Sequence, residues 1–517
     1  MAFLKCERRF PRWCPNVWLC ITLMLTWAQH TKCLDRSLER RIVYPLFLEG
    51  RSESGARILK LDDGLTLHLE QRSAFDDKLL IRTAGEDNTF VEKFMDASEF
   101  NSKLFQDPQH MASAVVSEED GLRLNGIIGE DMLIRPLLTM ERTAEGHVPH
   151  LLYREESLKN AAALDDYVFM PRSEDPRFED RQIRYGDVKE IQPEIHVVID
   201  SVFYTDFGRK ESDIIAYFGA VLNSINLRYA TIIDPKVTVK ITGFTLNKSV
   251  YDERYITTFG EYGEEFQQYV DMKSSLYSFR NAYRRQQPDL FAKVDAFVLV
   301  TGRDMCKLEE STSTLSCLVA GEAYVAGACT EYRAAIVEDK PWMYHSVRNI
   351  AHELAHSLGC VHDGDVPENG RENHPGATGC PWSDGYIMSY LRNSTNQFQF
   401  SSCCARRIKD VANLRSHICL HVNNTQRERP TTHYLPGTNM TLHEFCKASL
   451  AHKTRVYYFD ENEPYVGCMV PCRTANYQAG EKPVYSTAKV FAIDGIRCNG
   501  GNKVCIRGEC KAYPSKT

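Results

Sequence analysis

Apolar residues in the middle of the chain recur with two different periods. Residues 195–199 (IHVVI) and 296–300 (AFVLV) are short apolar runs typical of buried strands, and residues 237–241 alternate as a strand does. Between these segments, apolar residues fall on one face of a helix at 214–225 and again at 266–283. This alternation of strands and helices predicts an α/β domain with a mostly parallel sheet.

The chain before this domain has the pattern of a β-rich unit. Short alternating runs occur at 65–69 (LTLHL) and 79–82 (LLIR). A polar, charged stretch of linker composition follows at 171–185 and contains the sequence RQIR, which ends at Arg184. Because this R-x-x-R form is one that secretory-pathway convertases cut, we expect a convertase to remove a propeptide, residues 29–184.

The first residues have the pattern of a secretory signal peptide. Four basic residues precede an apolar run at 17–28 (VWLCITLMLTWA). A membrane anchor is the alternative, but these twelve residues are fewer than the roughly 17–25 needed to cross a bilayer. No later stretch is long enough to span one, so we expect a signal peptide at 1–28, a secreted product and no membrane anchor.

Charge and cysteine content narrow the range of partners and compartments. The 517 residues include 62 basic and 69 acidic side chains, a net charge of −7, which argues against nucleic acid as a partner. Of 18 cysteines, none lies between 34 and 305, and fourteen lie between 306 and 517. In an oxidising compartment these fourteen predict up to seven disulfides. Four sequons predict glycosylation, at Asn247, Asn393, Asn423 and Asn439.

The segment 350–363 (IAHELAHSLGCVHD) carries a candidate metal site. His352 and His356 are four residues apart, so a helix presents both imidazoles on one face, with Glu353 placed to act on water as a general base. Gly359 can end the helix in a left-handed conformation, and the turn returns His362 as a third ligand. Three imidazoles with one open position are typical of catalytic zinc.

A structural zinc site is the alternative for this segment, since Cys360 lies within it. Structural sites are normally closed by four protein ligands and favour cysteine. Because Cys360 is one of fourteen cysteines in a secreted chain, we expect it to form a disulfide instead.

The spacing H-E-x-x-H-x-x-G-x-x-H resembles the signature of the metzincin zinc proteases. Met388 lies where that group has its Met-turn, and Asp363 directly after the third histidine resembles the reprolysin branch, which includes ADAM and ADAMTS proteins. The resemblance implies that Asp363 supports the fold beneath the zinc site. Tyr386 replaces the usual cysteine before the Ile-Met pair, which leaves the family's disulfide pairing open. Tyr390 is placed as in astacins, where the tyrosine binds zinc or stabilises an oxyanion; an ordinary packed tyrosine is the alternative.

The resemblance extends to both sides of the motif. Residues 41–70 look like the start of a reprolysin propeptide, and residues 321–329 (GEAYVAGAC) are similar to the edge strand that lines the substrate cleft. An extended peptide would pair antiparallel to that strand. Glu194 and Asp295 match positions that bind structural calcium in some reprolysins. Surface acids are the alternative reading of these two residues.

The C-terminal segment 436–517 is similar to the cysteine-rich module that follows the protease in ADAMTS proteins and in metalloproteases of tick saliva. Such modules commonly select the substrate on exposed loops. The resemblance implies a protease domain at 185–422 and a linker at 423–435. The propeptide has no cysteine between 34 and 184, so a thiolate could silence zinc only if Cys33 survived signal cleavage and reached the site. We therefore consider a carboxylate, with Asp180 as the candidate, beside plain steric blockage.

These patterns together predict a secreted zymogen of a zinc endopeptidase with Glu353 as its catalytic base. The fold expected is an α/β metzincin catalytic domain with a zinc helix and a Met-turn, between a β-rich propeptide and a small disulfide-rich module. Its substrates would be extracellular proteins, with host fibrinogen, fibrin or matrix proteins suggested by the resemblance to tick proteases. The alternative is a protease-derived binding protein that inhibits adhesion or clotting through its cysteine-rich module without cleavage.

Overall fold

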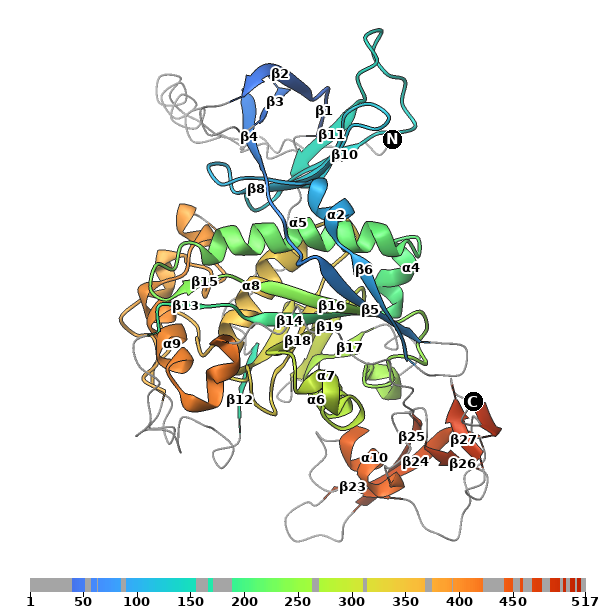
Figure 1. Cartoon of the computed structure of the whole chain (residues 1–517). Helices are drawn as coiled ribbons and strands as arrows, with labels where there is room; N and C mark the ends of the chain where they lie inside the picture. The colour runs from blue at the N-terminus through green and yellow to red at the C-terminus, as the bar shows by residue number, and fades with distance from the viewer. Residues whose placement is uncertain are drawn as a thin grey trace, which may run out of the picture.

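The computed structural model places three bodies of secondary structure along the chain (Figure 1). It describes residues 40–51, 57–62, 64–84, 90–154, 166–170, 188–262, 269–309, 314–367, 374–392, 394–421, 441–449, 456–458, 467–476, 484–492, 496–498, 503–506 and 509–512. Within this part of the chain, no helix is long and apolar enough to cross a membrane.

The central body is built on an eight-stranded sheet in the order β12-β21-β22-β18-β14-β16-β5-β6. Its inner strands are parallel, and only β21 and β6 run antiparallel to their neighbours β22 and β5. The strands are β14 (Glu194–Ile199), β16 (Lys240–Leu246), β18 (Ala296–Thr301), β21 (Gly321–Val325), β22 (Ala334–Glu338), β12 (Tyr167–Phe169), β5 (Lys78–Ala84) and β6 (Phe90–Asp96).

Helices cover both faces of this sheet, because the central strands β14 and β18 are buried at every position and mostly apolar. Alternate side chains of β14 and β18 point to opposite faces, so Val197 and Val298 pack with α5 and α8, whereas Val198 and Phe297 pack with α6. The long helices are α5 (Glu211–Tyr229), α6 (Met272–Gln286), α8 (His345–Ser357) and α9 (Ser402–Ala412).

Short elements complete the central body. They are β13 (Glu190–Ile191), α4 (Ser201–Asp206), β15 (Lys236–Val237), η2 (Phe259–Tyr262), β17 (Val270–Asp271), α7 (Pro288–Phe291), β19 (Met305–Glu309), β20 (Thr314–Ser316), η4 (Trp382–Asp384), η5 (Thr395–Phe398) and η6 (Arg415–His421).

The N-terminal region forms a nine-stranded antiparallel sheet that lies over α5 (Figure 1). Its own core alternates along the strands, as expected for a sheet with one face buried. The elements are β1 (Arg41–Val43), β2 (Leu46–Arg51), β3 (Arg57–Asp62), β4 (Leu65–Gln71), α2 (Ser98–Ser102), β7 (Leu104–Asp107), β8 (Ala112–Ser117), β9 (Arg123–Ile128), β10 (Met132–Pro136) and β11 (His150–Arg154).

The N-terminal region also supplies the strands at both edges of the central sheet. The hairpin β5–β6 extends it beyond β16, and β12 extends it beyond β21. The strands that we expected to stand alone in a separate N-terminal unit are therefore partly incorporated into the catalytic sheet.

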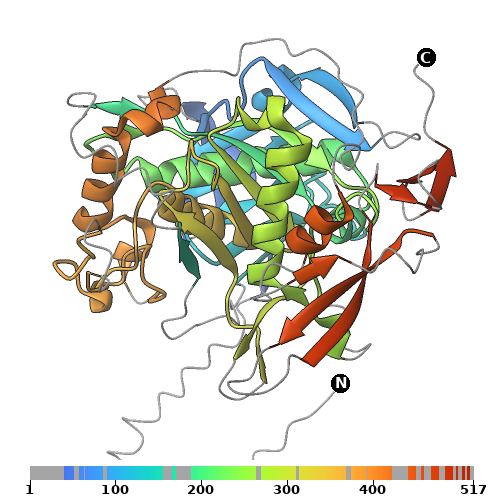
Figure 2. The same ribbon diagram turned by 90° about the horizontal axis from the view of Figure 1, so that it is seen from below.

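The C-terminal module packs beside α6, as both views show (Figures 1 and 2). It holds α10 (Leu442–Ser449), β23 (Val456–Tyr458), β24 (Met469–Asn476), β25 (Val484–Phe491), β26 (Arg497–Cys498), β27 (Lys503–Ile506) and β28 (Glu509–Ala512). Its cysteines form three disulfides around a small apolar core, Cys446–Cys472, Cys468–Cys505 and Cys498–Cys510.

Four more disulfides lie in the central body, so the fourteen downstream cysteines pair as predicted into seven. They are Cys306–Cys317, Cys329–Cys419, Cys360–Cys404 and Cys380–Cys403. The expected disulfide at Cys360 is confirmed.

Two predicted element boundaries are wrong. The helix expected from 266 begins at Met272, because the Asp271 side chain accepts a hydrogen bond from the Ser274 N–H (3.1 Å) and caps the helix there. The strand expected at 237–241 is interrupted, with β15 ending at Val237 and β16 beginning at Lys240.

Candidate active site

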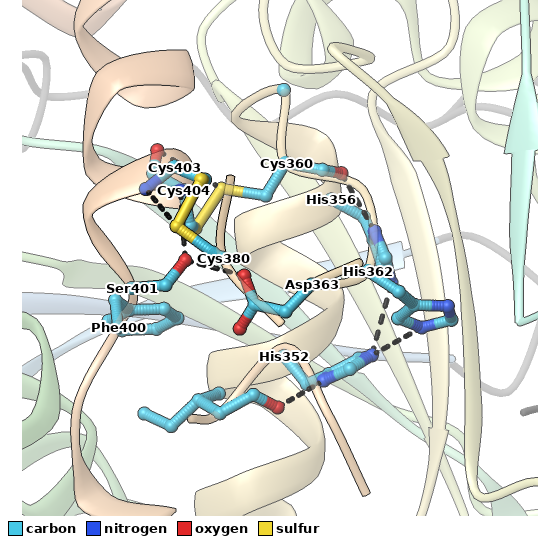
Figure 3. Close-up of a disulfide and its surroundings, with 12 residues drawn as sticks. His352, His356, Cys360, His362, Asp363, Cys380, Phe400, Ser401, Cys403 and Cys404 are labelled. Carbon is cyan, nitrogen blue, oxygen red and sulfur yellow. Dashed lines mark hydrogen bonds between the residues drawn. A yellow bond between two sulfur atoms is a disulfide. The ribbon is translucent and has the colours of Figure 1, made fainter. Parts of the chain in front are cut away.

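Helix α8 presents two imidazoles from successive turns. His352 and His356 are buried, and each is oriented by a backbone carbonyl: Nδ1 of His352 lies 2.9 Å from Ile387 O, and Nδ1 of His356 lies 2.9 Å from Cys360 O (Figure 3). With Nδ1 donating, both rings direct Nε2 to the same point. Burial lowers the pKa of both histidines, which keeps them neutral, the form that binds a metal.

A glycine turn returns the third imidazole to the same point. Helix α8 ends at Ser357, and Gly359 has φ of +107°. A Cβ at this position would also meet Val411 Cγ2 at 2.4 Å, so both the backbone conformation and the packing require glycine. The disulfide Cys360–Cys404 ties the turn to α9 (Figure 3). His362 therefore reaches the rings that α8 presents.

The separation of the three rings fits a tetrahedral metal. Nε2 of His352 lies 3.1 Å from Nε2 of His356 and 3.3 Å from Nε2 of His362. Zinc–nitrogen bonds of about 2.0–2.1 Å in tetrahedral geometry place neighbouring nitrogens about 3.3 Å apart. An all-imidazole set of this size suits zinc, so the residues present fit the ion that the motif implies.

Asp363 and the chain around Met388 support the site from below. The Asp363 N–H donates to Met388 O (3.0 Å), and its side chain accepts a hydrogen bond from the Ser401 hydroxyl (2.5 Å) at the start of α9 (Figure 3). Burial raises the pKa of Asp363 to about 6. Asp363 therefore lies beneath the histidines and does not join them, which is the arrangement that the resemblance implies.

Glu353 is buried on α8 between the two histidines, and its Oε2 has no hydrogen-bond partner among the described residues. Burial, with the nearby charges of Asp166 and Glu322, raises the pKa of Glu353 well above its usual value. Gly321 on β21 makes room for it, since a Cβ there would lie 2.3 Å from Glu353 Oε1. A carboxyl group in this environment is able to exchange a proton with a reacting group.

A fourth side chain points at the three imidazoles, and it is an acidic residue that the sequence did not single out. Asp166 precedes β12 in the N-terminal region and is 1% exposed. Its carboxylate oxygens lie 2.8 Å from His362 Nε2, 3.2 Å from His352 Nε2 and 3.4 Å from His356 Nε2. These four side chains form the one group at this site that could hold a metal ion. Although burial opposes it, His362 and His352 hold the pKa of Asp166 well below its usual value.

Aromatic rings enclose the imidazoles. Tyr167, next to Asp166, packs against the rings of His356 and His362 at centroid distances of 4.9 and 5.1 Å, and its hydroxyl donates to Asp365 (2.7 Å). Tyr390 stacks on His352 at 5.5 Å from the opposite side. Its hydroxyl is buried and has no hydrogen-bond partner within the described part of the chain. Tyr390 therefore belongs to the wall of the site.

The two candidate calcium ligands also lie together. Glu194 and Asp295 are at most 1% exposed, and the Glu194 N–H donates to Asp295 Oδ2 (2.9 Å). Burial raises the pKa of Asp295 to about 8, and the charge of Glu194 adds to this. The surface-acid reading of these two residues is therefore wrong. Both lie away from the three histidines.

Asn247 does not fit a glycan acceptor. Its side chain is 2% exposed and donates a hydrogen bond to the Tyr255 hydroxyl (2.6 Å), so the folded structure leaves no room for a sugar there. Several other predicted sites lie outside the described residues, namely the signal peptide 1–28, Asp180, Arg184, Asn393, Asn423 and Asn439.

Sequence reasoning missed Asp166 because its only local signal is an acidic pair before an aromatic strand, LDDYVF, with no metal-ligand spacing. The contact joins residues that are almost two hundred positions apart in sequence, and only the pairing of β12 with β21 brings them together.

The comparisons with known proteins agree with this geometry. Residues 191–401 match the reprolysin model of metallopeptidase family M12. A silkworm (Bombyx mori) protein described as "a disintegrin and metalloproteinase with thrombospondin motifs like" is 27% identical over 79% of this chain and 57% of its own length. The chain thus spans little more than half of that relative.

Two scorpion venom proteins are similar over most of their length. The venom metalloproteinase BumaMPs1 of Olivierus martensii is 24% identical over 75% of this chain and 94% of its own length. The venom metalloproteinase antarease TserMP_A of Tityus serrulatus is 26% identical over 67% of this chain and 86% of its own length. The particular likeness to tick proteases stays a prediction.

Proposed function

We propose that this chain is a secreted, zinc-dependent metalloendopeptidase of metallopeptidase family M12, made as a latent zymogen. The observation that carries the proposal is the convergence of three buried imidazoles at metal-binding distance beside a buried carboxyl group. Seven disulfides support an oxidising, extracellular setting.

The residues around the histidines divide the work of peptide hydrolysis. Zinc, when bound, supplies a Lewis acid that polarises a carbonyl group and makes water more acidic. Glu353 accepts the proton from the attacking water and passes it to the leaving amine, a role that its raised pKa favours. Tyr390 has a hydroxyl free of described partners at this wall, and it donates a hydrogen bond to the developing oxyanion.

Strand β21 holds the substrate. It lies at the edge of the protease's own part of the sheet and is buried beneath β12. An extended peptide that replaces β12 would pair with its backbone, which explains how one site accepts many sequences.

The zymogen is latent because β12 and Asp166 occupy the site. β12 pairs parallel to β21, with Tyr167 opposite Ala323 and Phe169 opposite Val325, in the direction opposite to that expected of a substrate. A chain in this direction fills the cleft without presenting a peptide bond for hydrolysis. Asp166 fills the position that the three histidines leave open. Cleavage after Arg184 by a convertase would free the N-terminal region to leave.

Digestion of casein tests the proposed activity. The mature enzyme, obtained by convertase treatment of the full secreted chain, is compared with its Glu353→Gln variant, and zinc content is measured for both. We expect equal zinc content and a loss of about a thousandfold or more in the variant's rate. Casein cleavage that survives in the variant, or a wild-type protein without zinc, would contradict the assignment.

Substrates and calcium complete the proposal. Extracellular proteins are the substrate class, so fibrinogen, fibrin and matrix proteins belong in the digestion panel. Glu194 and Asp295 bind a structural calcium ion, because two buried carboxyl groups side by side are suitable hard-oxygen ligands. Calcium should raise the melting temperature of the wild type but not that of a Glu194→Gln variant. An equal rise in both proteins would show that Glu194 does not bind calcium.

A further inference from the structure

A cavity of about 290 Å³ extends from His352, the first of the three histidines, along α8 towards its N-terminus. Its lining joins His352, Glu353 and Tyr390 to three arginines, Arg228, Arg348 and Arg392. Three guanidinium groups around one cavity repel one another, so we expect negatively charged groups close to them.

The lining also holds Asp304 and Glu338, and the acidic side chain that contacts the arginines is Glu130, from the N-terminal region. It lies in the turn between β9 and β10, and its side chain is only 7% exposed. One carboxylate oxygen accepts a hydrogen bond from Arg228 Nη2 (2.8 Å), and the other lies 3.5 Å from Arg348 Nη1. Although burial opposes it, the charges of Arg228, Arg348 and Arg392 lower the pKa of Glu130. Glu130 is thus an ionised side chain inserted into a cationic pocket.

Two of the arginines are held in place by the protease itself. Arg228 donates from Nη1 to Ser224 O (3.0 Å) and Ser224 Oγ (2.9 Å) within α5. Arg348 donates to Ser389 O (2.7 Å) and Gln397 O (3.1 Å) around the Met-turn. These bonds do not depend on the N-terminal region, so the pocket stays formed and cationic when Glu130 leaves.

The register of β21 assigns the pocket to one side of the scissile bond. β12 covers Ala323 to Val325, whereas the cavity borders Leu318, Ala320 and Gly321 at the start of the strand. A substrate antiparallel to β21 runs from the end of the strand towards its start. Residues that follow the scissile bond, the primed side, therefore lie at the cavity.

We propose that Arg228, Arg348 and Arg392 form a primed-side subsite that selects a carboxylate, the side chain of a substrate glutamate or aspartate. The inference rests on the proposed function, since it deepens the specificity of the same site. Glu130 occupies this subsite in the zymogen as a substrate carboxylate does in the mature enzyme. Arginine is suited to this role because its planar fork binds a carboxylate through charge-assisted hydrogen bonds.

A peptide set of matched pairs tests the subsite on the mature enzyme prepared from the full chain. Internally quenched peptides carry Glu, Gln or Lys at each of the first two primed positions, with amidated C-termini. A second arm compares free with amidated C-termini, because a terminal carboxylate offers the same chemistry. We expect kcat/KM at one position to be about tenfold higher for Glu than for Gln, and lowest for Lys. A tenfold ratio is about what one buried hydrogen bond to a charged group contributes.

Arg392→Glu is the informative variant, because Arg392 is half-buried and lies two residues beyond Tyr390. It should reverse the order so that Lys is preferred over Glu. The control is Arg406→Glu on α9, an exposed position outside the cavity, which should keep the wild-type preference. An enzyme that cleaves Glu and Gln peptides equally, or a Glu preference that survives Arg392→Glu, overturns the subsite while leaving the protease assignment intact. A preference confined to free C-termini overturns the side-chain proposal.

A binding arm keeps this test separate from catalysis. The mature Glu353→Gln protein is titrated with the same Glu and Gln peptides by calorimetry. Tighter binding of the Glu peptide that is lost in the Arg392→Glu background supports the subsite even if no substrate is turned over. Equal binding of both peptides contradicts it.

Discussion

The N-terminal region extends the catalytic sheet at both edges, and the two extensions differ in depth. At one edge, β5 pairs with β16 from Gly243 to Leu246 and carries the β6 partner behind it. At the other edge, β12 covers three residues of β21 and has half-buried side chains. The first edge is part of a shared buried core, as in the interior of a domain. The second edge is a short pairing of half-buried residues, as for a bound peptide.

The deep edge shares its core with the protease. Leu79 and Ile81 of β5 and Leu104 of β7 belong to the same buried cluster as α5 and α8. Gly219 on α5 is shaped for this contact, since a Cβ there would lie 2.6 Å from Leu104 Cδ1. Arg82 of β5 is buried as well and is paired with Glu92 (2.8 Å) and Gln287 (2.6 Å).

The shallow edge carries the chemistry instead, through Asp166 and Tyr167 at the histidines. The difference leads us to propose that folding support and inhibition use separate parts of the N-terminal region. In this proposal β5 is the anchor that holds the region on the protease, and β12 is the plug that closes the site at the three histidines. The two should therefore be separable by mutation.

Truncation of the anchor should have the largest effect on stability. Ile81 is fully buried in the shared core, so Ile81→Ala should lower the free energy of unfolding of the full chain by about 4 kcal/mol. The matched change on the plug is Val168→Ala, half-buried, which should cost less than about 1.5 kcal/mol. Chemical denaturation of both variants measures the ratio, and equal losses would abolish the distinction between anchor and plug.

Removal of the charge at Glu130 should have the next largest effect. Glu130→Gln leaves buried guanidinium groups without a counter-charge and should cost about 3 kcal/mol. The control is Asp131→Asn in the same turn, whose pair with Arg154 is exposed and should contribute less than about 1 kcal/mol. Denaturant titrations compare the two. A Glu130→Gln loss as small as that of the control would mean that the cationic pocket does not help to hold the N-terminal region on the protease.

Acid should loosen the anchored region by a smaller amount. His150 is buried, its Nε2 accepts the Leu124 N–H (2.9 Å), and burial lowers its pKa to about 4. The unfolded chain takes up a proton first as the pH falls below about 6.5, so stability that is complete above that pH is lost between about 6.5 and 4. At about 1.36 kcal/mol per pKa unit, the loss should reach about 2 kcal/mol at pH 5. A His150→Gln variant should lack this component of the pH dependence, and an unchanged pH profile would exclude His150 as its source.

The patterns in the sequence predicted the central body better than its surroundings. The motif at 352–362 predicted the converging imidazoles because a helix and a glycine turn fix those positions locally. The apolar runs located β14 and β18, since strands buried on both faces are mostly apolar. These features depend on residues that are close together in the sequence.

The features that the sequence did not reveal depend on long-range pairing. Neither the addition of β5 to β16 nor the arrival of Asp166 and Glu130 at the protease leaves a local pattern, because each joins segments far apart in sequence. Asp180, the candidate carboxylate for latency, lies outside the described residues, and Asp166 is the carboxylate that the structure places at the histidines. A single acidic residue forms no repeating pattern in the sequence, so the sequence does not predict which residue it contacts.

The activity of an uncleavable zymogen tests the separation of anchor and plug most directly. Arg184→Ala removes the expected convertase site, and Asp166→Ala is then added, with Glu353→Gln as a background control and denaturation to monitor folding. We predict that Arg184→Ala alone is inactive on a peptide substrate, and that the added Asp166→Ala gives zinc-dependent cleavage while the free energy of unfolding changes by less than about 1 kcal/mol. A folded Asp166→Ala zymogen as silent as its parent would show that Asp166 does not close the site.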